Sequence, residues 1–254
     1  MDFSLILTLL FGASALILLA DEAILKRRRQ AASNTIEPLP VQYARSLFPV
    51  ILIVLVIRSF VVEPFRIPSA SMMPGLVDGD FILVSKFSYG LRVPVVNSKI
   101  LSTGHPQRGD VVVFRLPSDP SIHYIKRLIG LPGDHIVVHD NTIFINGARV
   151  PAKRDGEYTD GYGFSGADLE VERLGERNHL IMLAKNRSST DYDAVVPPRN
   201  YFFMGDNRND SEDSRFAPVG FVPDENLDGR AMLIWMNWRI PGWPIWNRFG
   251  TKVN

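Results

Sequence analysis

The sequence predicts an all-β domain anchored by two N-terminal transmembrane α-helices. Two long apolar runs lie within the first 62 residues, and most of the remaining chain consists of short segments rich in Val, Ile and Phe. Gly, Pro and Asp separate these segments, as they separate the strands of β-domains. No helical periodicity of useful length follows residue 62, so we expect few helices there.

The first apolar run, residues 3–20, carries no charged residue and is long enough for a transmembrane helix. A cleavable signal peptide is the alternative, and "ASA" at 13–15 resembles a cleavage site. However, no Lys or Arg precedes the run, whereas the basic cluster "KRRR" follows it at 26–29. This order opposes a signal peptide. We therefore predict a first transmembrane helix over residues 1–20.

The second apolar run, residues 46–62, carries a single charge at Arg58, near its far end. An arginine there can extend its guanidinium to the membrane interface. Because basic loops stay on the cytoplasmic side, residues 21–45 are predicted to be a cytoplasmic loop. A second transmembrane helix over 46–63 then places residues 64–254 on the outer side.

Candidate strands in this outer part are residues 80–87, 110–116, 135–150, 200–207 and 229–238. "NG" at 146–147 is a plausible type I′ hairpin turn. Residues 151–178 are polar and contain five glycines, so we expect them to supply no core. The segment 151–199 is predicted to be an excursion from the β-domain.

Composition excludes several classes of function. The chain has 28 Lys and Arg against 27 Asp and Glu and no cysteine. It thus lacks the concentrated basic charge of a nucleic-acid-binding protein, and thiol catalysis, disulfides and thiolate zinc sites are excluded. The five histidines do not have the spacing of a helical metal pair, and residues 206–217 depart from a calcium loop. We predict no metal and no cofactor.

Three stretches carry candidate chemistry: "PSASMMPGL" (68–76), "YIKRLIGLPGD" (124–134) and "MGDNRNDSEDSR" (204–215). Each has an ordinary interpretation when it is taken alone. Ser71 suits a local turn, Lys126 suits an exposed strand face, and the third stretch suits a solvated, salt-bridged loop. No single stretch therefore predicts a function.

Together, and with "RGDVVVF" (108–114) and "GRAMLIWMNW" (229–238), these stretches resemble bacterial type I signal peptidases of the two-span proteobacterial type. The resemblance covers nearly the whole chain and is weakest over 151–199. It implies the β-fold that these enzymes share with self-cleaving repressors. It also implies a membrane-anchored serine endopeptidase that removes signal peptides from exported preproteins.

By this resemblance Ser71 is the nucleophile and Lys126 its general base. A free lysine has a pKa near 10.4, so only about one amine in 2,500 is neutral at pH 7. The neighbours Ile125 and Leu128 are apolar, and desolvation by such neighbours lowers the pKa of a lysine. Strand alternation turns Arg127 away from the dyad.

The resemblance assigns the remaining site residues as well. Ser69 would contribute to the oxyanion hole, and Ser211 would orient the lysine. Structural support is expected from Asp206, Arg208, Asp213 and Arg215. Two shallow pockets for the small side chains of an Ala-x-Ala cleavage site would be lined by Phe65, Ile67, Pro68, Met72, Tyr124 and Ile125.

The implied partners are exported preproteins and membrane lipid, with no nucleic acid. The implied setting is the bacterial inner membrane, next to the export translocon, with the catalytic domain of a monomer on the outer side. Trp243 and Trp246 either pack on the β-domain or seat it at the bilayer surface.

Two other functions compete with this one. The first is a Ser/Lys protease of the same clan with one specialised substrate, or one that cleaves itself. The second is a catalytically idle, membrane-tethered β-domain. Two membrane spans and the absence of a helix-turn-helix pattern oppose a self-cleaving repressor, and the presence of Ser69, Ser71 and Lys126 together opposes an idle domain.

Overall fold

The computed structural model describes residues 3–31, 37–92, 99–159, 163–185, 187–239 and 241–254. The chain forms two compact units. The first unit consists of residues 1–62 and 91–101, and the second of residues 63–90 and 102–254.

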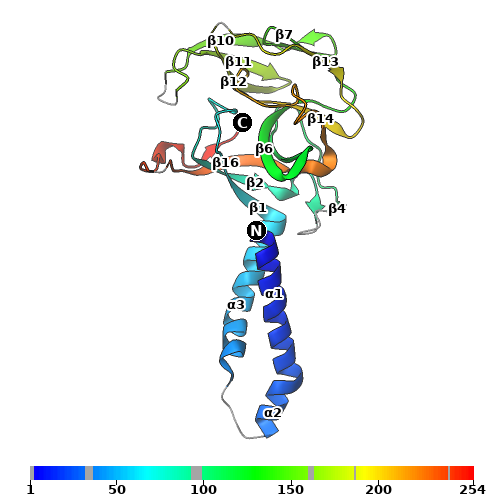
Figure 1. Ribbon diagram of the computed structural model, residues 1–254, viewed down its shortest axis with the longest axis vertical. Coiled ribbons are helices and arrows are strands. Elements are labelled where there is room, and N and C mark those ends of the chain that lie inside the picture. Colours follow the sequence, from blue (N-terminus) through cyan, green and yellow to red (C-terminus); the bar gives the residue numbers. More distant parts are fainter. Residues whose placement is uncertain (1–2, 32–36, 93–98, 160–162, 186, 240) are drawn as a thin grey trace. The chain divides into compact units, whose positions relative to one another are not determined.

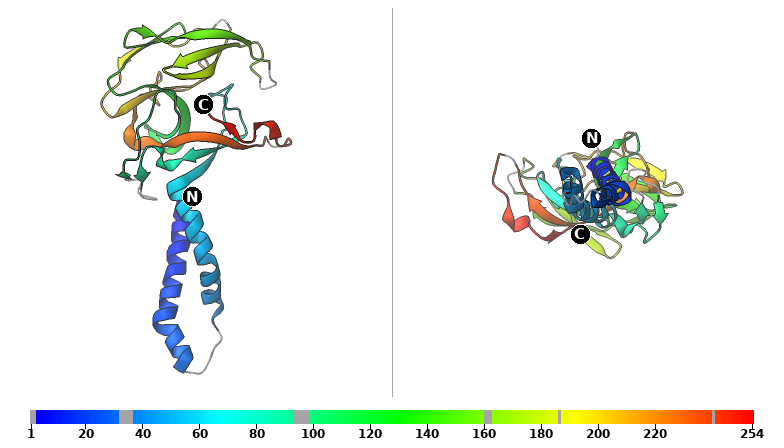
Figure 2. Two further views of the ribbon diagram at one scale, coloured as in Figure 1. Left: turned by 180° about the vertical axis from the view of Figure 1, so that it is seen from behind. Right: turned by 90° about the horizontal axis from the view of Figure 1, so that it is seen from below.

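The first unit is helical. Helix α1 (Phe3–Ala20) continues through a π-helical segment (Asp21–Leu25) into α2 (Lys26–Ala31), and α3 (Leu39–Val56) continues through a second π-helical segment (Ile57–Val61). The stretches Leu5–Arg29 and Leu39–Val61 are long and apolar enough to cross a membrane. Helices α1 and α3 lie side by side (Figure 2), with the rings of Phe11 and Phe48 stacked at 5.2 Å.

The helices extend beyond the apolar runs that predicted them. After α1, an i,i+4 ion pair between Lys26 and Glu22 (3.0 Å) supports the polar turns. Helix α3 begins after Pro38 with Pro40 in its first turn, where a missing N–H removes no helical hydrogen bond. Helical structure therefore covers part of the segment 21–45, which was predicted to be a loop. The first unit also contains a short strand pair, β3 (Leu91–Arg92) and β4 (Lys99–Leu101).

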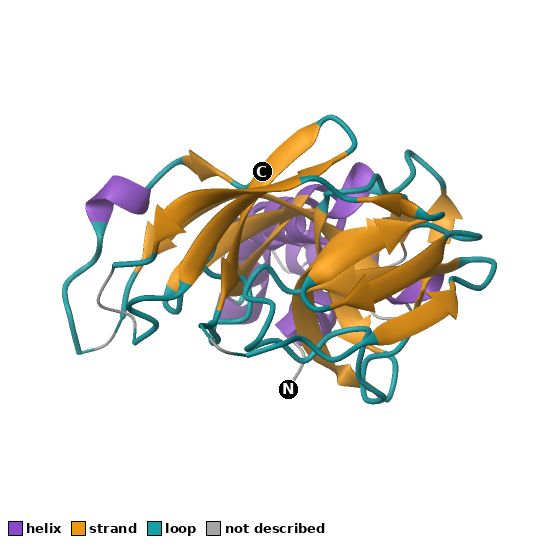
Figure 3. Ribbon diagram, turned by 90° about the horizontal axis from the view of Figure 1, so that it is seen from above, coloured by secondary structure: helices purple, strands orange, loops and turns teal. Residues whose placement is uncertain are grey.

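The second unit is built of strands, as predicted (Figure 3). In its described part the helical elements are three short 3-10 turns, Lys86–Ser88, Asp224–Asn226 and Trp246–Arg248. The main sheet has eight strands in the order β1-β2-β16-β5-β6-β14-β15, and β17 pairs with β16. Figure 1 labels β1, β2, β6, β14 and β16 of this sheet. The bounds of these strands are β1 (Val62–Arg66), β2 (Asp80–Ser85), β5 (Val111–Leu116), β6 (Asp119–Gly130), β14 (Asn200–Met204), β15 (Val222–Pro223), β16 (Leu227–Asn237) and β17 (Thr251–Lys252).

Two smaller sheets complete this unit. One has the order β13-β7-β8-β9 and the other the order β10-β11-β12. Their strands are β7 (His135–His139), β8 (Thr142–Ile145), β9 (Ala148–Arg149), β10 (Ala152–Glu157), β11 (Asp168–Leu174), β12 (Arg177–Leu183) and β13 (Tyr192–Val195).

The five predicted strand segments all contain strands, and 135–150 forms three (β7, β8 and β9). The turn predicted at 146–147 is confirmed. Asn146 and Gly147 have φ angles of 52° and 80°, as a type I′ turn requires, and Ile145 pairs with Ala148 across it.

The prediction that residues 151–178 supply no core is wrong. These residues contribute β10 and β11, and Tyr158 and Ala167 pack with Met73, Val77 and Met182 in a buried cluster. Both residues lie in the connection between β10 and β11 rather than in a strand, whereas β10 itself is almost wholly exposed. A few apolar residues in this connection are therefore enough to form core, although the segment as a whole is polar.

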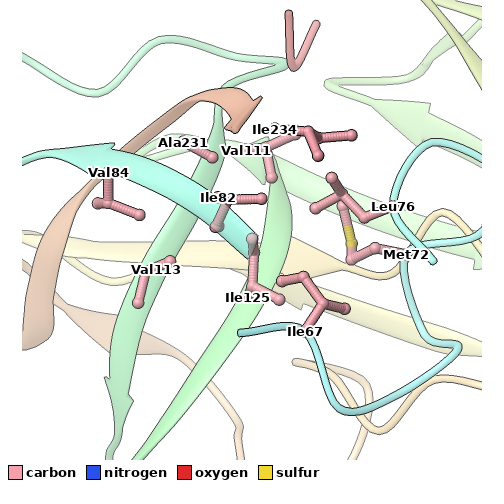
Figure 4. Packing of buried hydrophobic residues seen from close by; sticks show 10 residues of the cluster. All are labelled: Ile67, Met72, Leu76, Ile82, Val84, Val111, Val113, Ile125, Ala231 and Ile234. Atoms are coloured by element: carbon pink, nitrogen blue, oxygen red, sulfur yellow. The ribbon is translucent and has the colours of Figure 1, made fainter. Parts of the chain in front are cut away.

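The segment after β1 is fixed by the main core. Ile67, Met72 and Leu76 pack against side chains of β2, β5, β6 and β16 (Figure 4). All three are at most 2% exposed, and burying each side chain contributes about 1.5–3 kcal/mol. Buried side chains on both sides of Ser71 thus fix this segment, so it is not a flexible linker.

Candidate active site

The backbone around Ser71 is held by Asn207. The Asn207 N–H donates to the Ser71 carbonyl at 3.1 Å, and its side-chain amide donates to the Ala70 carbonyl at 3.2 Å. Asn207 is 2% exposed. These two bonds join the segment 67–79 to the loop 205–215, and Asn207 is 137 residues from Ala70 in the sequence.

Gly205 permits this close approach. A Cβ atom at position 205 would lie 2.5 Å from the Ser71 carbonyl oxygen and 2.2 Å from the Ser211 hydroxyl. Real Cβ atoms do not come so close to other atoms, so any larger residue must displace one of the two segments. Glycine is required here for space, since its backbone does not adopt a positive φ.

Strand β6 places Lys126 opposite Ser71. It lies between β5 and β14, with Lys126 paired to Val112. The Lys126 Nζ lies 2.6 Å from the Ser71 Oγ, and the two residues are only 4% and 7% exposed. The structure therefore forms a direct, buried contact between the two residues predicted to be nucleophile and base.

Burial lowers the pKa of Lys126 from 10.5 to about 8. The carboxylates of Asp213, Asp206 and Glu212 oppose this shift, and the guanidinium of Arg215 adds to it. At a pKa of 8, about one amine in ten is neutral at pH 7. The fold thus supplies a usable fraction of free amine next to the Ser71 hydroxyl.

The two other predicted serines differ in their contacts. The Ser69 Oγ lies 3.3 Å from the Ser71 Oγ, so the two hydroxyls face the same space. The Ser211 Oγ is buried and makes no hydrogen bond within the described residues. Ser211 and the Ser71 carbonyl lie against the same face of Gly205, and Ser211 has no bond to Lys126.

The four predicted supporting residues form three buried ion pairs. Arg127 binds Asp206 through two bonds of 2.7 Å, and Arg215 binds Asp213 at 2.8 Å. Arg208 does not pair within its own loop. It binds Glu172 of β11, so the excursion 151–199 anchors the loop.

His179 connects two of these pairs. Its Nε2 lies 3.2 Å from Glu172 and 4.0 Å from Asp206. Burial would raise the pKa of Glu172, but the neighbouring Arg208 and His179 lower it to about 2. Burial lowers the pKa of His179. The carboxylate is thus held ionised inside the protein by its partners.

A cleft with a volume of about 430 Å³ contains the dyad. Of the six residues predicted to bind substrate, Pro68, Tyr124 and Ile125 line it. Ile67 and Met72 are in the main core and Phe65 packs against it. The Phe65 ring lies 5.4 Å from that of His123, which lines the cleft.

Sequence reasoning gave no role to Gly205, Asn207 or Glu172. The first two lie within the third quoted stretch, where Gly and Asn also suit an ordinary turn. Glu172 lies in the polar excursion, and nothing local distinguishes it from its exposed neighbours. In the described part of the chain, no group of three His, Asp or Glu residues is arranged to hold a metal ion.

The sequence matches the family described as "Signal peptidase, peptidase S26" over residues 41–238. The chain belongs to this family. It is 44% identical to a signal peptidase I of Pseudomonas fluorescens and 42% identical to one of Pseudomonas aeruginosa. Each match covers 95% of this chain and 94% of the relative. A signal peptidase I of Buchnera aphidicola is 38% identical over 82% of this chain and 78% of its own length.

This S26 peptidase also matches a crystal structure of a signal peptidase I from Enterococcus faecalis. The identity is 30%, over 50% of this chain and 96% of the other, with a TM-score of 0.34. Membership of the family makes the chain a serine endopeptidase that removes signal peptides. Its substrates are therefore preproteins, and its two apolar helices fit a membrane anchor.

Proposed function

We propose that this signal peptidase cuts by a Ser71/Lys126 dyad, after an Ala-x-Ala-type site. The observation that carries the proposal is the buried 2.6 Å contact between Lys126 Nζ and Ser71 Oγ. The lowered pKa of Lys126 supports it, since a general base needs a free electron pair at working pH.

In the first step the Ser71 Oγ attacks the scissile carbonyl carbon and passes its proton to the Lys126 amine. The carbonyl oxygen becomes an oxyanion, which the Ser69 hydroxyl and the Ser71 N–H would stabilise. Collapse breaks the C–N bond. The proton on Lys126 moves to the leaving amine, and the signal peptide remains as an ester on Ser71.

The second step hydrolyses this ester. Lys126, neutral again, takes a proton from water as the water oxygen attacks the carbonyl carbon. The Ser71 Oγ leaves and recovers a proton from the Lys126 ammonium. One lysine thus serves both halves of the reaction, and no histidine is needed.

We further propose that the domain organisation follows the predicted topology. Residues 64–254 would lie on the outer face of the bacterial inner membrane, next to the export translocon, as a monomer in contact with lipid. One chain carries both dyad residues, which supports the monomer. The basic cluster at 26–29 supports the orientation.

The test is cleavage of a preprotein with an Ala-x-Ala site by wild type, Ser71→Ala and Lys126→Ala. We expect wild type to cut and both variants to lose detectable activity, because each removes one end of the dyad. Cutting by either variant would contradict the dyad. Failure of the wild type on this substrate, with cutting of some other preprotein, would indicate a specialised protease instead.

A further inference from the structure

A hydrogen bond between two cleft residues has no part in the mechanism proposed above. The Tyr124 hydroxyl of β6 donates to the Glu212 carboxylate at 2.5 Å, and both side chains line the cleft. This bond is the main reason that the pKa of Tyr124 is raised to about 12. The hydroxyl therefore keeps its proton over the working pH range and remains the donor.

The ring of Tyr124 lies beside the predicted general base. The Lys126 Nζ is 5.4 Å from the centroid of this ring. The face of an aromatic ring attracts an ammonium but not a neutral amine. A ring held at this position favours the protonated lysine, and the negative charge of Glu212 acts in the same direction.

Glu212 differs from the other carboxylates near Lys126. Asp206 and Asp213 are each bound to a buried arginine, whereas no ion pair of Glu212 occurs in the described part of the chain. The charged or titratable groups that act on Lys126 or line its cleft are Asp206, Asp210, Glu212, Asp213 and Arg215 of the loop, and His123 and Tyr124 of β6.

We propose that Glu212 is a positioning residue that holds the Tyr124 ring against the Lys126 amine and thereby sets the pH range in which the enzyme works. The inference rests on the proposed function, because it takes Lys126 as the general base. It adds to that function a residue outside the dyad, which acts through a neighbour and does not touch the substrate bond.

The test compares kcat and KM from pH 6 to 10 for the full-length enzyme in detergent, with Glu212→Gln, Tyr124→Phe and the double variant. For Glu212→Gln we expect the acid limb of kcat to move about half a pH unit lower, which raises the fraction of plateau activity on that limb about threefold. Tyr124→Phe should shift the limb in the same direction. The double variant should move no further than the larger single shift, because both changes break one connection.

Glu176→Gln is the matched control. Glu176 is an exposed glutamate in the turn between β11 and β12, so its loss removes the same charge and should leave the profile unchanged. A Glu212→Gln profile that overlays wild type would overturn the inference. A shift of the acid limb of kcat in Glu212→Gln but not in Tyr124→Phe would also overturn it. The same holds if Glu212→Gln raises only KM, by an equal factor at every pH.

Failure of the inference can be told from failure of the proposed function. If Ser71→Ala and Lys126→Ala are inactive while Glu212→Gln follows wild type, only the role of Glu212 is wrong. If Lys126→Ala retains wild-type activity, the general base is wrong and the inference falls with it.

Discussion

At position 126 the fold buries an amine where an apolar side chain would pack without cost. Desolvation disfavours the ammonium. The resulting pKa of about 8 therefore affects the free energy of unfolding as well as catalysis. The pKa of Lys126 is lower in the folded than in the unfolded protein. The free-energy cost of burying the charged amine is therefore complete below pH 8 and decreases as the pH rises. It disappears above pH 10.5, which is the pKa of this lysine in the unfolded protein.

Lys126→Met should therefore stabilise the protein while it abolishes activity. The lowered pKa corresponds to a cost of about 3 kcal/mol at neutral pH. Loss of the bond to Ser71 offsets part of the gain, so we expect the free energy of unfolding to rise by about 1–3 kcal/mol at pH 7. Urea unfolding followed by tryptophan fluorescence, at pH 7 and pH 10, measures both this gain and its decline with pH.

Lys153→Met is the control for this comparison, because Lys153 is an exposed lysine of β10. Its free energy of unfolding should stay within about 0.5 kcal/mol of wild type. A Lys126→Met protein that is less stable than wild type at pH 7 would contradict the burial cost.

Ser69→Ala tests the oxyanion hole. Its hydroxyl lies 3.3 Å from that of Ser71, where it can turn toward a developing oxyanion. Loss of one such donor lowers turnover by about 10²–10³, so we expect kcat to drop by that factor and KM to stay within about twofold. Ser69→Thr, which keeps the hydroxyl, should retain more activity. Wild-type turnover in Ser69→Ala would exclude this role.

At the scale of elements, the catalytic segments are positioned by ion pairs that cross the domain. The Arg208–Glu172 pair joins the loop 205–215 to β11, and neither side chain is more than 2% exposed. Removing one member of a buried pair leaves an uncompensated charge, which costs about 3–5 kcal/mol. Replacing both by apolar residues of similar size removes the charge altogether.

Arg208→Leu should consequently lower the free energy of unfolding by about 3–5 kcal/mol. Arg208→Leu combined with Glu172→Met should recover most of that loss, because neither member of this pair then leaves an unpaired charge. Denaturant titration of the three proteins measures the recovery. Equal losses in the single and the double variant would show that the pair contributes no charge compensation.

The Arg208–Glu172 pair also shows which features of the structure could not be predicted from the sequence. Local patterns are enough for the strands around β5, β14 and β16 and for the turn at 146–147, since strand periodicity and turn residues act over a few positions. The resemblance adds Ser71 and Lys126, which prove to be in contact. The role of Glu172 could not be predicted. A charged residue in a polar segment gives the same sequence pattern whether it is solvated or buried against an arginine 36 residues away.

At the scale of the whole molecule, function depends on which side of a membrane the second unit occupies. Two helices of the first unit are long and apolar enough to cross a membrane, whereas Lys126 and Ser71 belong to the second unit. Basic residues are costly to translocate, and residues 26–29 hold four of them between the two apolar helices. We therefore predict that this segment stays in the cytoplasm and that residues 64–254 lie on the outer side.

Single cysteines test this topology directly, because the natural chain contains none. We expect a membrane-impermeant maleimide to label Lys185→Cys, an exposed position after β12, in spheroplasts with an intact inner membrane. Arg28→Cys, in the segment between the apolar helices, should react only after that membrane is opened, and inverted vesicles should reverse the pattern. The unchanged, cysteine-free chain gives the background, and both variants should still cleave preprotein. Labelling of Arg28→Cys in intact spheroplasts would contradict the orientation, since the charge at 26–29 would then lie on the outer face.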